Sequence, residues 1–263
     1  MTAPRLKLLT AGNPKTSKGA KYGYATAVLH LAPSTLSGRN VCPMASPGCI
    51  EGCLNLAGRG GLAPRGNLGY EEVLAGIRTN KIQDARIRRT KRFYEDRNGF
   101  LADLDGDIGR WVAWCLKEGY RPAVRLNGTS DLPWEAYAAD VMAKYAGEEG
   151  GAAVQFYDYT KVYKRIRASL YPEQTGFPAN YHLTFSQSES NEDACATVLA
   201  LGGTVATVFR TKDEIPDRWL GYPTINGDAH DLRFLDSPGS VVALYAKGPW
   251  AKRDRSGFVK DAL

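Results

Sequence analysis

The chain has 263 residues, of which 43% are hydrophobic and 24% are charged. This composition is typical of globular proteins and excludes a disordered or fibrous class. No segment approaches the roughly 18 consecutive apolar residues of a membrane span, and the N-terminal stretch MTAPRLKLLTAGNPKTSKG lacks the apolar core and cleavage site of a signal peptide. We therefore expect a cytoplasmic protein with no membrane partner.

The net charge of +6 is unevenly distributed along the chain. Residues 1–131 carry 20 basic and 11 acidic side chains, and residues 132–263 carry 14 and 17, so the two parts have charges of +9 and −3. A basic first half favours an anionic partner, which long-range attraction alone does not identify as nucleic acid or small molecule.

Short β-branched or aromatic runs that end in polar residues alternate with helical stretches, a pattern typical of βα units around a parallel sheet. We expect strands at 24–31, 123–126, 153–157, 181–185, 204–209 and 241–245. An α/β barrel commonly needs about 250 residues. We therefore predict one α/β domain over 1–263, a partial or complete (β/α) barrel.

Helices are expected at about 70–97, 100–118, 134–146 and 190–201. In the second of these, apolar residues recur at steps of three and four, which predicts one buried face that includes Cys115. Cys195 falls among apolar residues of the fourth helix and is also expected in the core.

Three cysteines follow the first predicted strand with the spacing C-x6-C-x3-C: Cys42, Cys49 and Cys53. Thiolates select zinc or iron–sulfur clusters. A structural zinc needs a fourth ligand, and no CxxC pair or nearby Cys/His pair supplies it, since His30 is expected inside the strand. Three cysteines suit a [4Fe-4S] cluster with one open iron, although zinc, a purely structural cluster and metal-free buried thiols remain alternatives.

Polar residues follow the later predicted strands. In a barrel, active sites gather at the carboxyl ends of the strands, so these residues are expected to face the cysteine loop. The candidates are Asn127, Gly128, Ser130, Asp131, Asp158, Thr160, Lys161, Ser186, Ser188, Asn226 and Asp228. Each also has an ordinary explanation, because Asp and Ser before helices commonly serve as caps and NGTSD or NGD can form a simple turn.

The run Lys81–Arg97 contains seven basic residues and offers possible phosphate contacts, although such runs are usually solvated helix faces. Among the histidines, His182 is expected inside a strand as a core residue. His230, flanked by Asp228 and Asp231, is the better candidate for proton transfer.

At the cysteine loop and at PAVRLNGTSDLPWE, FYDYTK and YHLTFSQS, the sequence resembles the uncharacterised gene product 88 family of bacteriophages. The resemblance covers most of the chain. It implies a phage origin, and hence the host cytoplasm, more firmly than it implies a reaction.

The sequence has a more distant likeness to radical S-adenosylmethionine enzymes, which also place three cysteines after the first strand of a partial barrel. That likeness implies that Cys42, Cys49 and Cys53 ligate a [4Fe-4S] cluster whose open iron binds S-adenosylmethionine. It also implies that residues 127–131 lie near the amino group of this cosubstrate, and that Asp158, Ser186 and Asn226 line its ribose or the substrate. The spacing differs from the usual C-x3-C-x2-C of that superfamily.

Two functions of different classes follow. The first is an iron–sulfur enzyme of radical S-adenosylmethionine type that modifies a nucleotide, nucleic acid or protein. The second is a nucleic-acid-binding protein with a structural zinc or iron–sulfur site and phosphate contacts from residues 81–97. A barrel that has lost catalysis and serves as an interaction protein is a third possibility.

Overall fold

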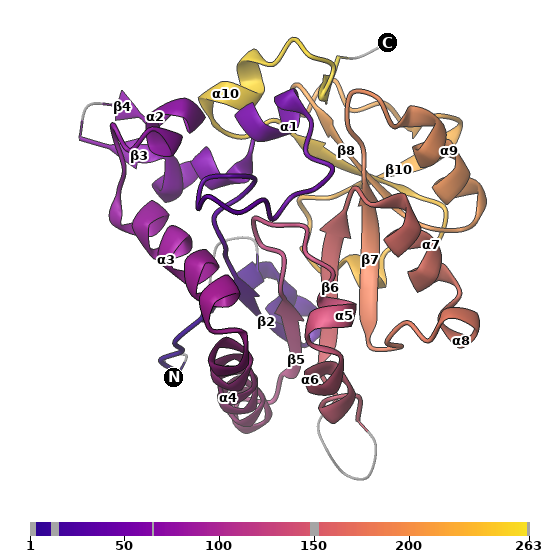
Figure 1. Cartoon of the computed structure of the whole chain (residues 1–263). Coiled ribbons are helices and arrows are strands. Elements are labelled where there is room, and N and C mark those ends of the chain that lie inside the picture. The colour runs from indigo at the N-terminus through magenta and orange to yellow at the C-terminus, as the bar shows by residue number, and fades with distance from the viewer. Residues whose placement is uncertain (1–3, 12–15, 65, 148–152, 262–263) are drawn as a thin grey trace.

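The computed structural model describes residues 4–11, 16–64, 66–147 and 153–261 (Figure 1). Its strands are β1 Leu9–Ala11, β2 Tyr24–Leu29, β3 Leu62–Ala63, β4 Gly66–Asn67, β5 Arg121–Arg125, β6 Gln155–Thr160, β7 Tyr181–Ser186, β8 Val205–Phe209, β9 Arg218–Trp219, β10 Tyr222–Asn226, β11 Val241–Tyr245 and β12 Val259–Lys260.

The helices include four 3₁₀ segments, labelled η. They are η1 Thr16–Tyr22, α1 Pro47–Glu51, η2 Leu54–Leu56, η3 Gly58–Gly61, α2 Tyr70–Leu74, α3 Lys81–Glu95, α4 Arg97–Lys117, α5 Trp134–Tyr137, α6 Ala139–Lys144, α7 Tyr163–Leu170, α8 Pro172–Thr175, α9 Glu192–Ala200, η4 Arg233–Leu235 and α10 Gly248–Arg253.

The main sheet has the strand order β1-β2-β5-β6-β7-β8-β11-β10-β9, and β12 pairs with β8. Every neighbouring pair is parallel except β1 with β2 and β10 with β9. Strands β2, β5, β6, β7 and β8 are neighbours in chain order, as expected of successive βα units. The predicted α/β class with a mostly parallel sheet is therefore confirmed.

No closed barrel is present in the described part of the chain, because β1 and β9 form the two ends of the sheet and do not pair. The prediction of a complete barrel is thus not confirmed. The sheet also begins one strand earlier than predicted. The antiparallel β1 has only three residues, too few for a periodic signal, so the cysteine loop follows the second strand, which is the first of the parallel set.

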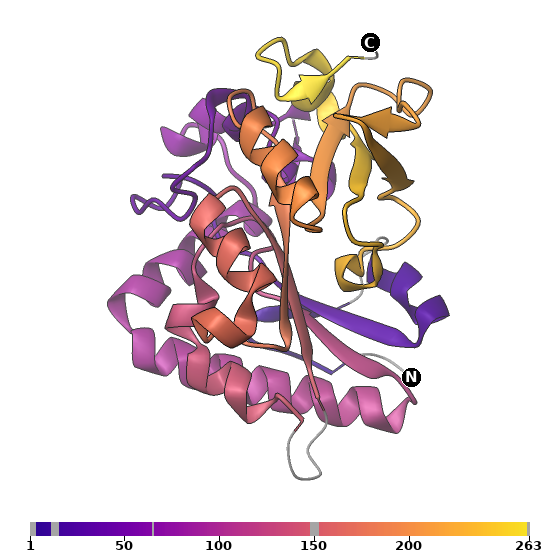
Figure 2. The same ribbon diagram turned by 90° about the vertical axis from the view of Figure 1, so that its right-hand side faces the viewer.

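The long helices cover one face of the sheet, and η1 and η4 lie against the other (Figure 2). The main core lies under the helices and is rich in aromatic side chains, including Phe93, Phe100, Trp111 and Trp134. A smaller cluster on the opposite face joins Tyr157 to the segment around η4. Both faces of the parallel strands are therefore covered, as parallel sheets require.

Two predicted helices are interrupted. The stretch 70–97 divides into α2 and α3, since Gly76 has a φ of 68° and Asn80 caps α3 by accepting from the backbone N–H groups of Ile82 and Gln83. The stretch 134–146 divides into α5 and α6 at Ala138. Cys115 and Cys195 are completely buried in the core, as predicted.

Candidate metal centre

The cysteine loop crosses the carboxyl edge of the parallel strands, on the side where α1 and α10 lie together in Figure 1. Cys42 precedes α1, Cys49 lies within it, and Cys53 follows it directly. Ser46 caps the N-terminus of α1, and its hydroxyl accepts from the Cys49 backbone N–H. All three cysteines are half-buried free thiols.

The three thiols lie within electrostatic reach of one another. Burial raises the pKa of Cys42 to about 12, and the thiols of Cys53 and Cys49 add to this rise. Burial also raises the pKa of Cys53 to about 11, again with a contribution from Cys49. Such thiols are protonated at neutral pH unless a metal or a cation stabilises the thiolate.

Two cations flank the thiols. Lys161, directly after β6, lies near Cys49 and Asp131. Burial by itself lowers the pKa of Lys161, but Cys49 and Asp131 outweigh it and hold the pKa above its ordinary value. Burial lowers the pKa of Arg86 on α3 to about 10, against the opposing effect of Cys53.

Backbone contacts fix the position of Cys42. Its sulfur accepts from the Ser34 backbone N–H at 3.3 Å and lies 4.0 Å from the Thr129 carbonyl oxygen. The adjacent Val41 carbonyl accepts from the Asp131 backbone N–H at 2.8 Å. The loop after β2 is therefore attached to the loop after β5.

Other segments hold α1 and the residues that follow it. The Glu189 carboxylate, in the loop after β7, accepts from the Ser46 hydroxyl and from the Gly48 N–H at 2.7 Å. On the opposite side, Arg86 donates to the Asn55 carbonyl oxygen at 3.2 Å. Cys49 also packs against a cluster from the C-terminal segment that includes Phe258.

The predicted residues Asn127, Gly128 and Ser130 form a tightly bonded turn after β5. The Asn127 side-chain oxygen accepts from the Ser130 hydroxyl at 2.8 Å, from the Leu132 N–H at 2.9 Å and from Trp134 Nε1 at 3.1 Å. A Cβ on Gly128 would lie 2.7 Å from the Leu29 carbonyl oxygen. These residues hold the turn against the end of β2.

Asp131 and Asp158 are buried and already paired. Asp131 accepts from Arg165 at 2.5 Å and from the Lys161 N–H at 2.8 Å. Asp158 accepts from the Asn127 N–H at 2.8 Å and from the Tyr181 hydroxyl at 2.9 Å. Burial raises the pKa of Asp158 to about 7, although Arg125 opposes the rise. Both carboxyl groups thus link neighbouring strand ends.

The remaining predicted residues lie at separate strand ends. The Ser186 carbonyl, at the end of β7, accepts from Asn191 at 2.9 Å. Asn226 ends β10 and accepts from the Asp228 N–H at 2.9 Å. The Asp228 carboxylate in turn pairs with Lys247. In the sheet, β8 and β11 separate β10 from β7, so Asn226 and Asp228 form a group of their own.

A polar cluster lies on the face of the sheet opposite the long helices, and it joins His182 and Asp231 to Arg125, which was not among the predicted residues. Arg125 pairs with Asp231 at 2.9 Å, and its guanidinium lies 5.0 Å from the centre of the Tyr159 ring. Burial lowers the pKa of His182 to about 4, with a contribution from Arg233. The signal available in the sequence was the alternation RPAVR in β5, which directs both arginines to one face.

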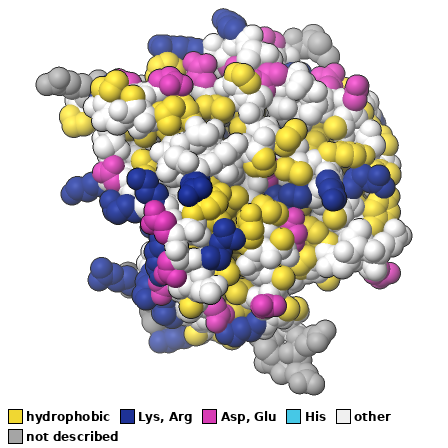
Figure 3. Space-filling model, viewed as in Figure 1, with side chains coloured by type: hydrophobic (Ala, Val, Ile, Leu, Met, Phe, Trp, Pro, Cys, Tyr) yellow, Lys and Arg dark blue, Asp and Glu magenta, His cyan; other side chains and the backbone are white. Residues whose placement is uncertain are grey.

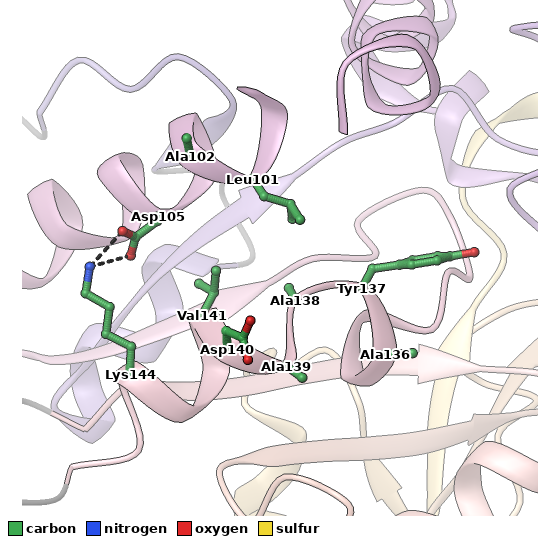
Figure 4. A pocket seen from close by; sticks show the side chains of 10 residues that line it. All are labelled: Leu101, Ala102, Asp105, Ala136, Tyr137, Ala138, Ala139, Asp140, Val141 and Lys144. Atoms are coloured by element: carbon green, nitrogen blue, oxygen red, sulfur yellow. Dashed lines mark hydrogen bonds and ion pairs between the residues drawn. The ribbon is translucent and has the colours of Figure 1, made fainter. Parts of the chain in front are cut away.

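A hollow of about 480 Å³ lies away from the cysteines, between α4 and the helices α5 and α6 (Figure 4). Lys144 and Asp105 form an ion pair of 2.7 Å at its edge. Its lining includes none of the predicted site residues, so it adds nothing to the candidate centre.

In the described ranges, no three His, Cys, Asp or Glu side chains form a group that could hold a metal ion. The geometry therefore gives no support of its own to metal binding. What fits an iron–sulfur cluster is the chemistry of the donors, because one segment supplies three soft thiols with two cations near them. The ligand assignment stays a prediction on that basis.

Fold and site together define a mixed α/β protein with a mostly parallel sheet and a cysteine-rich loop at the carboxyl edge. A family model described as gene product 88 matches residues 7–262, so the chain belongs to the gene product 88 family. No curated protein and no solved structure matches it. The resemblance to this phage family is confirmed, while the comparisons lend no support to the likeness to radical S-adenosylmethionine enzymes.

No helix of the described segments combines the length that a membrane span needs with sufficient apolar character.

Proposed function

We propose that this protein is an iron–sulfur enzyme of radical S-adenosylmethionine type in which Cys42, Cys49 and Cys53 ligate a [4Fe-4S] cluster. The observation that supports the proposal is that three thiols within electrostatic reach of one another lie at the carboxyl edge, in the segment after the first of five successive parallel strands. Catalytic groups of parallel α/β folds gather at this edge.

When bound, such a cluster supplies an electron, and its open iron supplies a position for the amino and carboxylate groups of S-adenosylmethionine. The chain provides the surroundings. Lys161 and Arg86 would offset the negative charge of the thiolates, because both already lie beside cysteine sulfur atoms. Glu189 would hold α1 in place through Ser46.

The predicted cosubstrate residues divide into two groups under this proposal. Internal hydrogen bonds already occupy the side chains of Asn127, Asp131 and Asp158. We therefore propose that these residues shape the site without touching the cosubstrate. Ser186 ends β7 next to β6, the strand that delivers Lys161, and is the best placed of the set for direct contact.

Metal and sulfide analysis of protein purified without oxygen tests the proposal. We expect about four irons and four sulfides per chain and a visible absorbance that dithionite bleaches. Cys49→Ala and Cys53→Ala should lose most of the iron. Cys195→Ala, a buried cysteine of α9, is the matched control and should retain it.

One zinc and no sulfide would overturn the enzyme proposal and favour the nucleic-acid-binding protein with a structural zinc. If the iron is present, turnover of S-adenosylmethionine under reducing, oxygen-free conditions is the next measurement. A cluster without such turnover would leave the metal centre standing and refute the radical type. The reducing host cytoplasm is the compartment that we propose for such a cluster.

A further inference from the structure

A second hollow, of about 280 Å³, lies between α3 and the segment that leads into β1. Its lining is mostly cationic and consists of Lys7, Leu8, Ala85, Arg88, Arg89 and Arg92. Figure 3 shows Lys and Arg side chains gathered on the side of the molecule where α3 lies. Three of the four cations are arginines, whose planar guanidinium groups match phosphate oxygens better than a lysine ammonium does.

Nearby carboxylates offset only part of this charge. Asp103 accepts from Lys7 at 2.6 Å and from Arg92 at 2.7 Å. Asp107 is buried and already pairs with Arg110 at 2.5 Å. Burial lowers the pKa of Arg89, with Asp107 opposing the change. Arg92 also pairs with Asp96 at 3.8 Å. The four cations therefore face three carboxylates, of which Asp107 is shared with Arg110, and an excess of positive charge remains.

Helix α3 extends this charge along its exposed face. Lys81, Arg88 and Lys91 are exposed, and residues 81, 85, 88 and 92 recur at helical steps on one side. The helix has 15 residues, a length of about 22 Å at about 1.5 Å per residue. Duplex DNA carries one charge per roughly 1.7 Å of its axis, so this face can follow several phosphates.

The opposite face of the same helix contacts the cysteine loop. Gln83 donates to the Gly60 carbonyl at 2.7 Å, and Thr90 accepts from the Ala32 backbone N–H at 2.8 Å. Arg86 lies beside Cys53. A ligand bound along the outer face of α3 would thus have the thickness of this helix, about 10 Å, between it and the candidate metal centre.

We propose that the cationic hollow and the exposed face of α3 bind the phosphate backbone of a nucleic acid. This binding goes beyond the function proposed above and does not rest on it. The binding itself does not depend on the cluster, since none of the lining residues is a cysteine.

Fluorescence anisotropy with short labelled oligonucleotides tests the binding, with single-stranded DNA, duplex DNA and RNA of one sequence. The variant is Arg88→Glu with Lys91→Glu. The matched control is Lys164→Glu with Arg167→Glu, two exposed cations of α7 that give the same change of charge. We expect the α3 variant to bind on the order of tenfold more weakly, with a salt dependence shallower by about 2, and the control to bind like wild type.

Three results would overturn the proposal: no binding to any oligonucleotide, equal losses in the α3 and α7 variants, or binding to anionic phospholipid vesicles in place of nucleic acid. Melting curves of both variants exclude misfolding. The two proposals fail separately, because Cys49→Ala should lose iron and keep nucleic-acid binding, whereas the α3 variant should keep iron and lose binding.

Discussion

Replacing Asn127 by alanine removes the oxygen that organises the turn after β5. The Leu132 N–H and Trp134 Nε1 then become donors without this acceptor, and both residues are buried, at 4% and 0% exposure. Each unsatisfied buried donor costs about 1–3 kcal/mol. Asn127→Ala should therefore lower the free energy of unfolding by about 4 kcal/mol, from two donors at about 2 kcal/mol each.

Urea unfolding followed by circular dichroism measures this loss, with Ser130→Ala as the matched control. Ser130 donates only one hydrogen bond to the same oxygen, so its loss should be about 1 kcal/mol. If Asn127→Ala costs less than about 1 kcal/mol, the turn does not depend on this side chain. Its amide would then be free for the cosubstrate contact that the sequence suggested.

Three further outcomes follow from the site. Burial raises the pKa of Asp158 from 3.8 to about 7, so the native state holds this proton more tightly than the unfolded state does. The free energy of unfolding should therefore fall as the pH rises from about 4 to about 7. Urea titrations at several pH values should show that Asp158→Asn removes this fall. In Gly128→Ala the new Cβ would lie 2.6 to 2.9 Å from its neighbours. The free energy of unfolding should therefore fall by about 1–3 kcal/mol, seen as a lower melting temperature. Gly106→Ala in α4 should not destabilise the protein. Lys161→Met should reduce the iron retained after gel filtration, and Lys164→Met should leave it unchanged.

Sequence patterns predicted the strands that are long enough to show a period. The strand 241–245 matches β11 at both ends, and 181–185 matches β7 within one residue. Strands β1, β9 and β12 have two or three residues each. Their pairing is set by neighbours distant in the chain, which no local pattern records.

The spacing of the cysteines led to the prediction of a metal centre, but the surroundings of these cysteines were not predictable. Glu189 contacts Ser46 across 143 positions, and Arg125 contacts Asp231 across 106. Arg86 belonged to a run that was expected to meet solvent or phosphate, yet it turns toward Asn55. The period of α3 shows which residues share a face and does not show what that face meets.

The way the cysteine loop is supported bears on whether a metal there is structural or catalytic. The binding free energy of a structural metal adds to the free energy of folding, because without the metal the contacts within the protein do not hold the site in place. Here Glu189 caps α1, Arg86 holds the stretch after Cys53, and the Val41 carbonyl joins the loop to the turn after β5. These contacts come from α3 and from the loops after β5 and β7, and none of them needs a metal. Because these contacts already hold the loop in place, we expect that removing a bound cluster would cost little stability compared with Asn127→Ala.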